Sequence, residues 1–263
     1  MAGELRAPSP WHVMRAIARR ELGIAMRRKL VRLLFLGSVG PPVVFAIILV
    51  VRILAEKVGG VDLGWDPVLE FLRWQAFPVA LLALGLGTPI VAVDRSEDVL
   101  YLYAVRPVSP WHYAVGKMLA VAFPSLLLLM LPGVLIALFR QGLMTDVSTG
   151  ESLLMVGKVT VAAVFLAAAY AGVSVGPSAA TKRARWALLI AIGFFWIPDA
   201  VAQIIWRHDA YALGPGNAAE ELLSALFKDR SAIRGWLSVL VLCVYAVAGA
   251  WITMVRVRKE MTP

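Results

Sequence analysis

Six long apolar runs, separated by short polar segments, dominate the chain. Each run reaches the ~20 helical residues that cross the hydrocarbon core of a bilayer. The runs lack the alternation of apolar and polar residues that marks the strands of a membrane β-barrel. The pattern therefore predicts an all-α, polytopic membrane protein with six transmembrane helices. The predicted spans are Leu33–Ala55, Phe71–Val93, Trp111–Phe139, Leu153–Gly176, Trp186–Trp206 and Trp236–Val255.

The polar segment before the first run, residues 1–32, carries the signals of a helix. Ser9 followed by Pro10 is typical of a helix start. Apolar residues from Trp11 to Ala25 then recur at helical spacing, with arginines on the other faces. This predicts a basic amphipathic interfacial helix that binds membrane lipid; a solvated tail is the alternative. The segment lacks the apolar core and cleavage site of a signal peptide, so we expect none.

Prolines inside the runs predict kinks or breaks, because proline lacks the backbone N–H that continues a helix. These prolines are Pro41 and Pro42 after Gly40, Pro78 and Pro89 in the second run, and Pro124 and Pro132 in the third. The fourth run is instead rich in small residues, which favour close helix packing over a pocket. These small residues are Ala162, Ala163, Ala167, Ala168, Ala169, Ala171 and Gly172.

Composition and charge add an orientation to this picture. The chain of 263 residues is 60% hydrophobic and only 16% charged, well below the charged share of a soluble domain. With the N-terminus placed inside, 17 of the 26 basic residues fall inside and 11 of the 17 acidic residues fall outside. The positive-inside rule then predicts cytoplasmic termini in a bacterial inner membrane. The net charge of +9 is thus a topology signal, and we expect no nucleic-acid partner.

Motifs for catalysis, ATP hydrolysis or metal binding are absent from the sequence. Gly116-Lys117 lacks the upstream glycine of a P-loop, and no G-x-S-x-G or H-E-x-x-H pattern occurs. Cys243 is the single cysteine, so an internal disulfide and a cysteine metal cluster are excluded. We therefore expect no catalytic residue, metal or cofactor. Asp199, within the fifth run, is a possible intramembrane polar site: it either binds a cationic substrate or caps a broken helix near the outer face.

The polar segment between the second and third runs is too long for a simple turn. Residues 97–105 are predicted to form a short helix, which Pro107 ends. Acidic residues at its start, Asp94, Glu97 and Asp98, suit the helix dipole. Apolar and tyrosine side chains at the tip of such a helix are typical of a docking element.

This segment resembles the permeases of ABC exporters of the ABC-2 type. That family carries a pattern like E-x-E-x-G-T-L, then P-V-S-R and G-K, between its second and third spans. Asp94, Leu100, Pro107, Val108, Ser109, Trp111, Gly116 and Lys117 fall in register with it. The departures are Ser96 for the second acid, Asp98 for the glycine, Val99 for the threonine and Pro110 for the arginine. The six-span layout with a basic entry helix also looks like this family.

The resemblance implies a coupling helix, within residues 94–110, that sits in a cleft of a cytoplasmic ATPase. Its contacts would be Asp94, Glu97, Asp98, Leu100, Leu102, Tyr103, Arg106 and Pro107, with Tyr103 and Leu102 exposed in the isolated subunit. Lys182, Arg183 and Arg185 would make a second cytoplasmic contact. Two ATPase copies would bind ATP and Mg²⁺, and a second permease copy or a related permease would complete the pathway. The segment 207–235 is expected to hold an outer amphipathic or re-entrant helix.

Two other functions compete with this interpretation. A membrane-embedded enzyme would use Asp199 or Asp94, and it predicts convergent polar residues within the spans. A secondary transporter predicts intramembrane charges for ion coupling and a detectable repeat. The sequence shows neither pattern, and it does not identify the transported substrate.

Overall fold

The computed structural model describes residues 9–59, 66–100, 103, 108–143, 149–206, 212–228 and 231–261. These residues form helices joined by turns, and none of them lies in a strand. The helices are α1 (Pro10–Ala25), α2 (Lys29–Gly59), α3 (Pro67–Gly87), α4 (Ala92–Ser96), α6 (Pro110–Leu143), α7 (Thr149–Ala180), α8 (Ala184–Trp206), α9 (Pro215–Phe227) and α10 (Ala232–Met261). Six of them are long and apolar enough to cross a membrane, which confirms the predicted all-α architecture and its six apolar helices.

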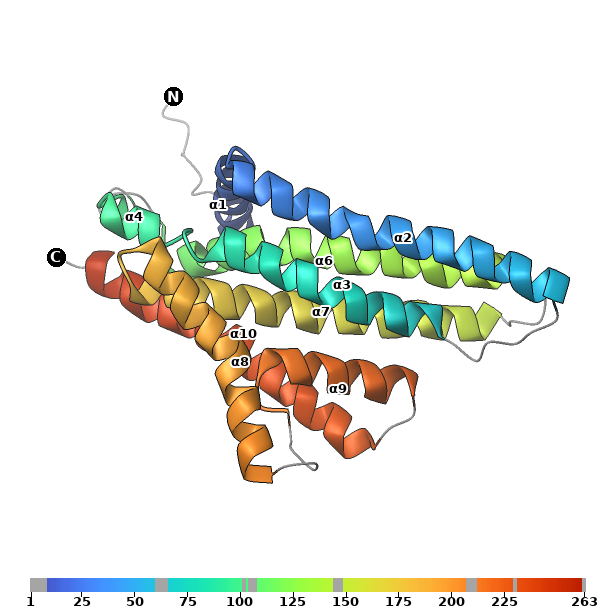
Figure 1. Ribbon diagram of the computed structural model, residues 1–263. Helices are drawn as coiled ribbons and strands as arrows, with labels where there is room; N and C mark the ends of the chain where they lie inside the picture. Colours follow the sequence, from blue (N-terminus) through green and yellow to red (C-terminus); the bar gives the residue numbers. More distant parts are fainter. Residues whose placement is uncertain are drawn as a thin grey trace.

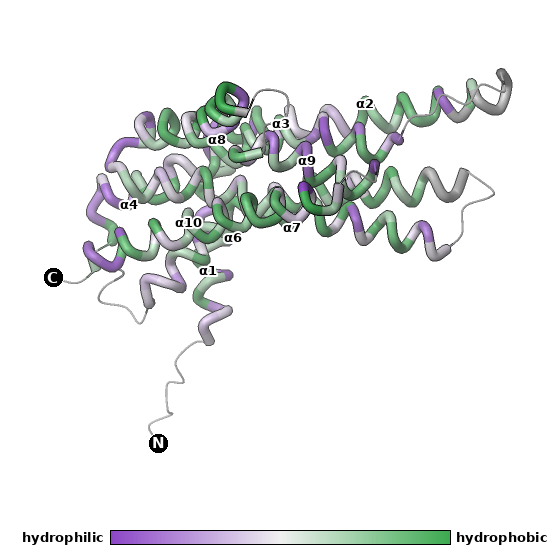
Figure 2. Tube along the Cα trace, turned by 90° about the horizontal axis from the view of Figure 1, so that it is seen from below, coloured by the Kyte–Doolittle hydropathy of each residue, from purple (hydrophilic) through white to green (hydrophobic). Residues whose placement is uncertain are grey.

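The long helices lie side by side as a bundle with two distinct ends (Figure 1). Helix α1, helix α4 and the C-terminal end of α10 lie at one end, which we call the terminal end; the C-terminal ends of α2 and α6 lie at the other, which we call the loop end. Helix α1 runs crosswise to the bundle, and α8 leans away from it. Figure 2 shows hydrophobic residues along the long helices and hydrophilic residues gathered at α4 and the end of α10.

Helix α7 packs against α10 through glycine, as the small residues of the fourth run predicted. A Cβ on Gly172 would overlap the Tyr245 carbonyl oxygen, and one on Gly176 would lie 3.0 Å from the Cα atom of Gly249. Two backbones that approach this closely gain dispersion contacts, which drive helix association where no water is available. The prediction of close packing for this run is confirmed.

Three of the long helices continue through their prolines. Pro41 and Pro42 lie inside α2, Pro78 inside α3, and Pro124 and Pro132 inside α6. Of the kink or break predicted at Gly40-Pro41-Pro42, the break is absent, because α2 is one helix from Lys29 to Gly59. Pro89 does end its helix: α3 stops at Gly87 and a turn leads to α4.

Gln75 supplies the hydrogen bonds that two of these prolines remove. Pro42 and Pro132 have no N–H for the carbonyls four residues earlier, which belong to Ser38 and Leu128. The Gln75 side-chain amide donates to both carbonyl oxygens, at 2.8 and 3.3 Å. Gln75 itself is fully buried. One glutamine on α3 thus completes the backbone hydrogen bonds of α2 and α6.

Helix α9 begins deep in the bundle beside the middle of α8. Asp199, seven residues before the end of α8, contacts the backbone at Gly214 and Asn217. From there α9 runs beside α10 toward the loop end, where Leu223 packs among Leu69 and Phe71. The helix predicted within 207–235 is therefore present over Pro215–Phe227.

Candidate functional site: a buried charge cluster beneath the polar turn

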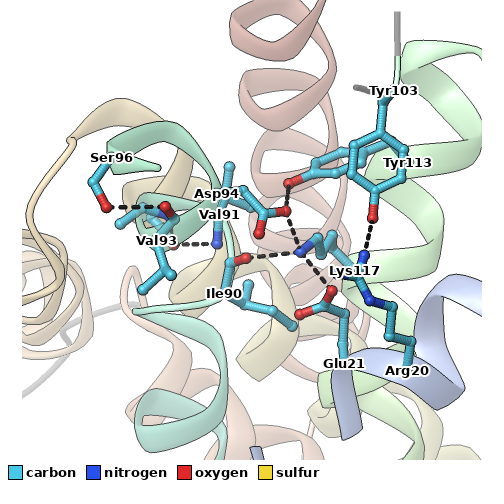
Figure 3. Close-up of polar contacts among 12 residues, drawn as sticks. Arg20, Glu21, Ile90, Val91, Val93, Asp94, Ser96, Tyr103, Tyr113 and Lys117 are labelled. Carbon is cyan, nitrogen blue, oxygen red and sulfur yellow. Dashed lines mark hydrogen bonds and ion pairs between the residues drawn. The ribbon is translucent and has the colours of Figure 1, made fainter. Parts of the chain in front are cut away.

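Lys117 lies at the centre of a polar cluster at the terminal end, close to the start of α6 (Figure 3). Its side chain is 0% exposed. The Nζ atom lies 2.6 Å from Asp94 Oδ2 and 2.9 Å from Glu21 Oε1, and it donates to the Ile90 carbonyl oxygen at 2.9 Å. A buried ammonium is tolerated only when its charge and its three protons are matched, as they are here.

Two tyrosines extend this cluster to a second cation. Tyr113 is fully buried and donates to Asp94 Oδ2 at 2.6 Å, and its ring meets the edge of the Tyr103 ring at 5.2 Å. Arg20 Nη1 donates to the Tyr103 hydroxyl oxygen at 2.8 Å. Burial raises the pKa of the Tyr103 hydroxyl, and the nearby Arg20 charge only partly opposes this, so the group stays neutral.

The cluster fastens α1 to α6, because Gly116 lets the two helices approach. A Cβ on Gly116 would lie 2.8 Å from Ile17 Cβ and 3.1 Å from the Met14 carbonyl oxygen. Glu21 then reaches Lys117 from the same face of α1, one turn beyond Ile17. The Gly116-Lys117 pair is therefore a packing position followed by a charged anchor. The whole cluster contains two carboxylates, those of Asp94 and Glu21, and two cations, Lys117 and Arg20, so its charges balance.

Helix α4 is held on its other side by α7 and α10. Ser178 Oγ accepts hydrogen bonds from the backbone N–H groups of Val91 and Ala92, at 2.9 and 3.0 Å. Arg95 donates to the Ala179 carbonyl oxygen at 2.6 Å and pairs with Glu260 at 2.6 Å. Adjacent residues Asp94 and Arg95 thus tie the five residues of α4 to opposite sides of the bundle.

The tip of the polar turn remains exposed. Ser96, Glu97 and Asp98 are solvent-accessible, and Asp98 has a φ of 52°, in the left-handed region. Asp and Asn tolerate this region better than most residues, and glycine adopts it freely. Asp98 stands where the resembled pattern has glycine, so the backbone here has the conformation for which glycine is suited.

Of the other residues predicted to contact the ATPase, some are buried within the subunit and some lie outside the described residues. Leu100 and Tyr103 are buried within the subunit, at 2% and 8% exposure. The expectation that Tyr103 is water-exposed in the isolated subunit is therefore wrong, because its ring packs on Tyr113 and its hydroxyl binds Arg20. Leu102, Arg106 and Pro107 lie outside the described residues, as do residues 101, 104 and 105. The helix predicted to begin at Glu97 is wrong at its start, because residues 97–99 form a turn after α4; Leu100 and Tyr103 are helical. Lys182, Arg183 and Arg185 are exposed at the turn before α8 and within its start.

Sequence reasoning missed the central residues of the cluster. Lys117 and Tyr113 both lie near the start of the third apolar run, and both are fully buried. Ser9 was expected to cap α1, but its hydroxyl bonds the His12 ring at 2.6 Å instead of a backbone N–H. The available signal for Lys117 was a lysine directly after a glycine at the start of an apolar run.

Asp199 caps a helix, but a neighbouring one. Its Oδ1 accepts from the Gly214 N–H at 2.6 Å and its Oδ2 from the Asn217 N–H at 3.1 Å, at the start of α9. The side chain is 8% exposed. A carboxylate at a helix N-terminus satisfies free N–H groups and complements the helix dipole. Asp199 therefore caps α9. The broken helix that the capping alternative supposed is absent, because α8 continues through Pro198.

The sequence matches no protein-family model, and no curated protein matches it either. Within the described residues, no group of three His, Cys, Asp or Glu side chains is placed to hold a metal ion.

Proposed function

We propose that the chain is the membrane-spanning permease subunit of an ATP-driven exporter of the ABC-2 type. The polar turn after α3 is the observation that carries this proposal. It presents an exposed acidic tip, Ser96 to Asp98, at the end of a short helix that is bound from both sides by polar contacts. The turn occupies the position of the coupling helix in the family that the sequence resembles. A separate cytoplasmic ATPase would bind ATP and Mg²⁺.

The contacts around α4 suit the transmission of force. Packed elements shift as units rather than deform continuously, so a displacement of the tip moves what it is fastened to. Lys117 connects the turn to α6 and α1, and Arg95 connects it to α7 and α10. An ATPase that moves the tip would thereby move three transmembrane helices and the crosswise helix α1 together.

In this proposal the terminal end faces the cytoplasm of a bacterial inner membrane. The exposed arginines of α1 then meet lipid headgroups, and the exposed residues Lys182, Arg183 and Arg185 offer a second contact to the ATPase. Two permease copies, identical or related, would pair around a two-fold axis and bind two ATPase subunits. The membrane-enzyme alternative is disfavoured because Asp94 Oδ2 and both carboxylate oxygens of Asp199 are engaged within the chain.

Purification of the tagged chain from native membranes tests the assembly. We expect the mass of two permeases with two ATPase subunits, together with ATP hydrolysis. The double variant Glu97→Lys with Asp98→Lys should lose the ATPase or its coupling while the permease stays folded, because both side chains are exposed. The control is Glu151→Lys at the loop end of α7, which should change neither the association of the ATPase nor its coupling to transport. A monomeric chain that transports without an ATPase would contradict the proposal.

Cysteine labelling tests the orientation separately. Ser96→Cys in a Cys243→Ser background places the only thiol at the exposed tip. We expect protection from membrane-impermeant maleimide in intact cells and labelling after lysis. Labelling from outside intact cells would reverse the proposed topology.

A further inference from the structure

A cavity of about 400 Å³ lies between α3, α7, α8 and α9, in the half of the bundle nearer the loop end. Each helix contributes one face to it: on α3 the lining residues are Arg73, Ala76, Phe77 and Ala80, at the spacing of a single helical stripe. Its volume falls within the range of pockets that hold drug-sized ligands. The cavity is partly open beside α8, because Trp196 and Gln203 in its lining are exposed.

The inner wall of this cavity is aromatic. The rings of Tyr170 and Phe195 lie 5.4 Å apart, and those of Phe195 and Trp196 also lie 5.4 Å apart. Tyr170 and Phe195 are buried, whereas Trp196 is 48% exposed at the opening. Aromatic faces attract cations, most strongly where the cation is shielded from water.

The charge of the lining is negative. Among the described residues that line the cavity, Asp199 and Glu220 are acidic and Arg73 is the only cation, and Arg73 is also paired with Glu70 at 2.9 Å. The N-terminus of α9 offsets only about half a charge. The Glu220 side chain is 51% exposed, so its carboxylate remains accessible beside its contact with Arg73. An anionic ligand would meet more repulsion than attraction here, whereas a cation meets both carboxylates and rings.

We propose that this cavity binds an amphipathic organic cation. The positive group lies between Glu220 and the rings of Phe195 and Trp196, and the apolar part packs on Ala76, Phe77 and Ala80. Binding by the chain requires no ATPase. The further idea that this ligand is the molecule exported by the chain does rest on the proposed function.

Tetraphenylphosphonium and tetraphenylborate test the sign of the charge, since the two ions share size and shape. The full chain is reconstituted in phosphatidylcholine nanodiscs, and binding of radiolabelled tetraphenylphosphonium is measured by scintillation proximity against empty nanodiscs. We expect saturable binding of one cation per chain and, in separate samples, no specific binding of radiolabelled tetraphenylborate; the ions are kept apart because together they form an insoluble salt. Glu220→Gln should weaken binding about 5-fold and Trp196→Ala about 10-fold, as expected for the loss of a partly exposed charge or an aromatic partner.

Two matched variants control for general effects. Glu221 is the next residue on α9 and pairs with Arg234 at 3.5 Å, and Trp186 is an exposed tryptophan on the same helix as Trp196. Neither lines the cavity, so Glu221→Gln and Trp186→Ala should bind like the wild type. Gln203→Glu adds a carboxylate to an exposed lining position and should tighten binding severalfold, an outcome that misfolding cannot produce.

Equal specific binding of tetraphenylborate in separate samples would overturn the proposal, and so would unchanged affinity for the cation in Glu220→Gln, Trp196→Ala and Gln203→Glu. Either result would mean that the cation only partitions into lipid, or that the cavity holds a bilayer lipid. Such a failure would not contradict the proposed complex with an ATPase, because that complex is tested by its mass and by variants of the polar turn. Conversely, cation binding without an associated ATPase would retain the site and reject the proposed function.

Discussion

Two groups of buried charges, one in each half of the bundle, differ in how completely they are satisfied. Around Lys117 the charges are closed off: the ammonium has no exposed surface, and it is matched by Glu21, Asp94 and the Ile90 carbonyl. Around Arg73 the charges border a cavity, Glu220 is half exposed, and the buried Arg73 Nε has no hydrogen-bond partner. A closed cluster fixes helices to one another, whereas an open one has room and charge for a ligand.

Lys117→Met should have the largest effect on stability, because it leaves Asp94 and Glu21 buried without their cation. Breaking a buried pair by removing one partner costs about 3–5 kcal/mol. We expect a large fall in the unfolding temperature in detergent, or no folded protein. Lys158→Met is the control, since Lys158 is partly exposed and contacts only the Phe227 ring at 5.8 Å among its described partners. Equal stability of the two variants would show that the cluster fixes nothing.

Gln75→Leu tests a neutral polar residue that lies within the helix bundle. The variant leaves the Ser38 and Leu128 carbonyl oxygens without a donor, and we expect a loss of about 2 kcal/mol. Restoring the two backbone N–H groups with Pro42→Ala and Pro132→Ala should reduce that loss. Unfolding measurements on the four combinations give the coupling directly; additive effects would mean that Gln75 does not replace the missing N–H groups.

Gly116→Ala tests whether close approach of α1 is required for the closed cluster. The added methyl group would lie 2.8 Å from Ile17 Cβ, and overpacking of this kind costs about 1–3 kcal/mol. Gly23→Ala on α1 has nothing within 4 Å of the new Cβ and should be neutral or slightly stabilising. Protection of α1 amides from hydrogen exchange should fall in Gly116→Ala only. An equal response in both variants would mean that the closed cluster does not require close approach of α1 at Gly116.

Asp199→Asn should have the smallest effect, since an asparagine still accepts one of the two hydrogen bonds at the start of α9 and loses the other bond and the charge. We expect a change of about 0.5–1 kcal/mol in stability. Because the negative charge faces the cavity, tetraphenylphosphonium binding should weaken at the same time. A loss as large as that of Lys117→Met would show that the open group also serves as a structural anchor.

Sequence patterns were sufficient for the helices but not for the contacts between their polar side chains. Apolar runs define the six long helices because backbone groups in a bilayer leave few other solutions. The partners of Lys117 come from Glu21 and Asp94, on two other elements, and helical spacing does not reveal which faces of separate helices meet. The break predicted at Gly40-Pro41-Pro42 is absent for a related reason: Gln75, 33 residues further along the chain, completes the hydrogen bonds that Pro42 removes.

The central claim is that the tip of the polar turn contacts an ATPase, and site-specific photocross-linking tests it most directly. A benzophenone side chain replaces Glu97, at the exposed tip, or Leu153, which is 75% exposed near the loop end. After irradiation of native cells, cross-linked chains are identified by mass spectrometry. The account predicts that position 97 captures a protein with P-loop and ABC signature motifs, and that position 153 does not. Capture of that ATPase from neither position, or from position 153 alone, would contradict it.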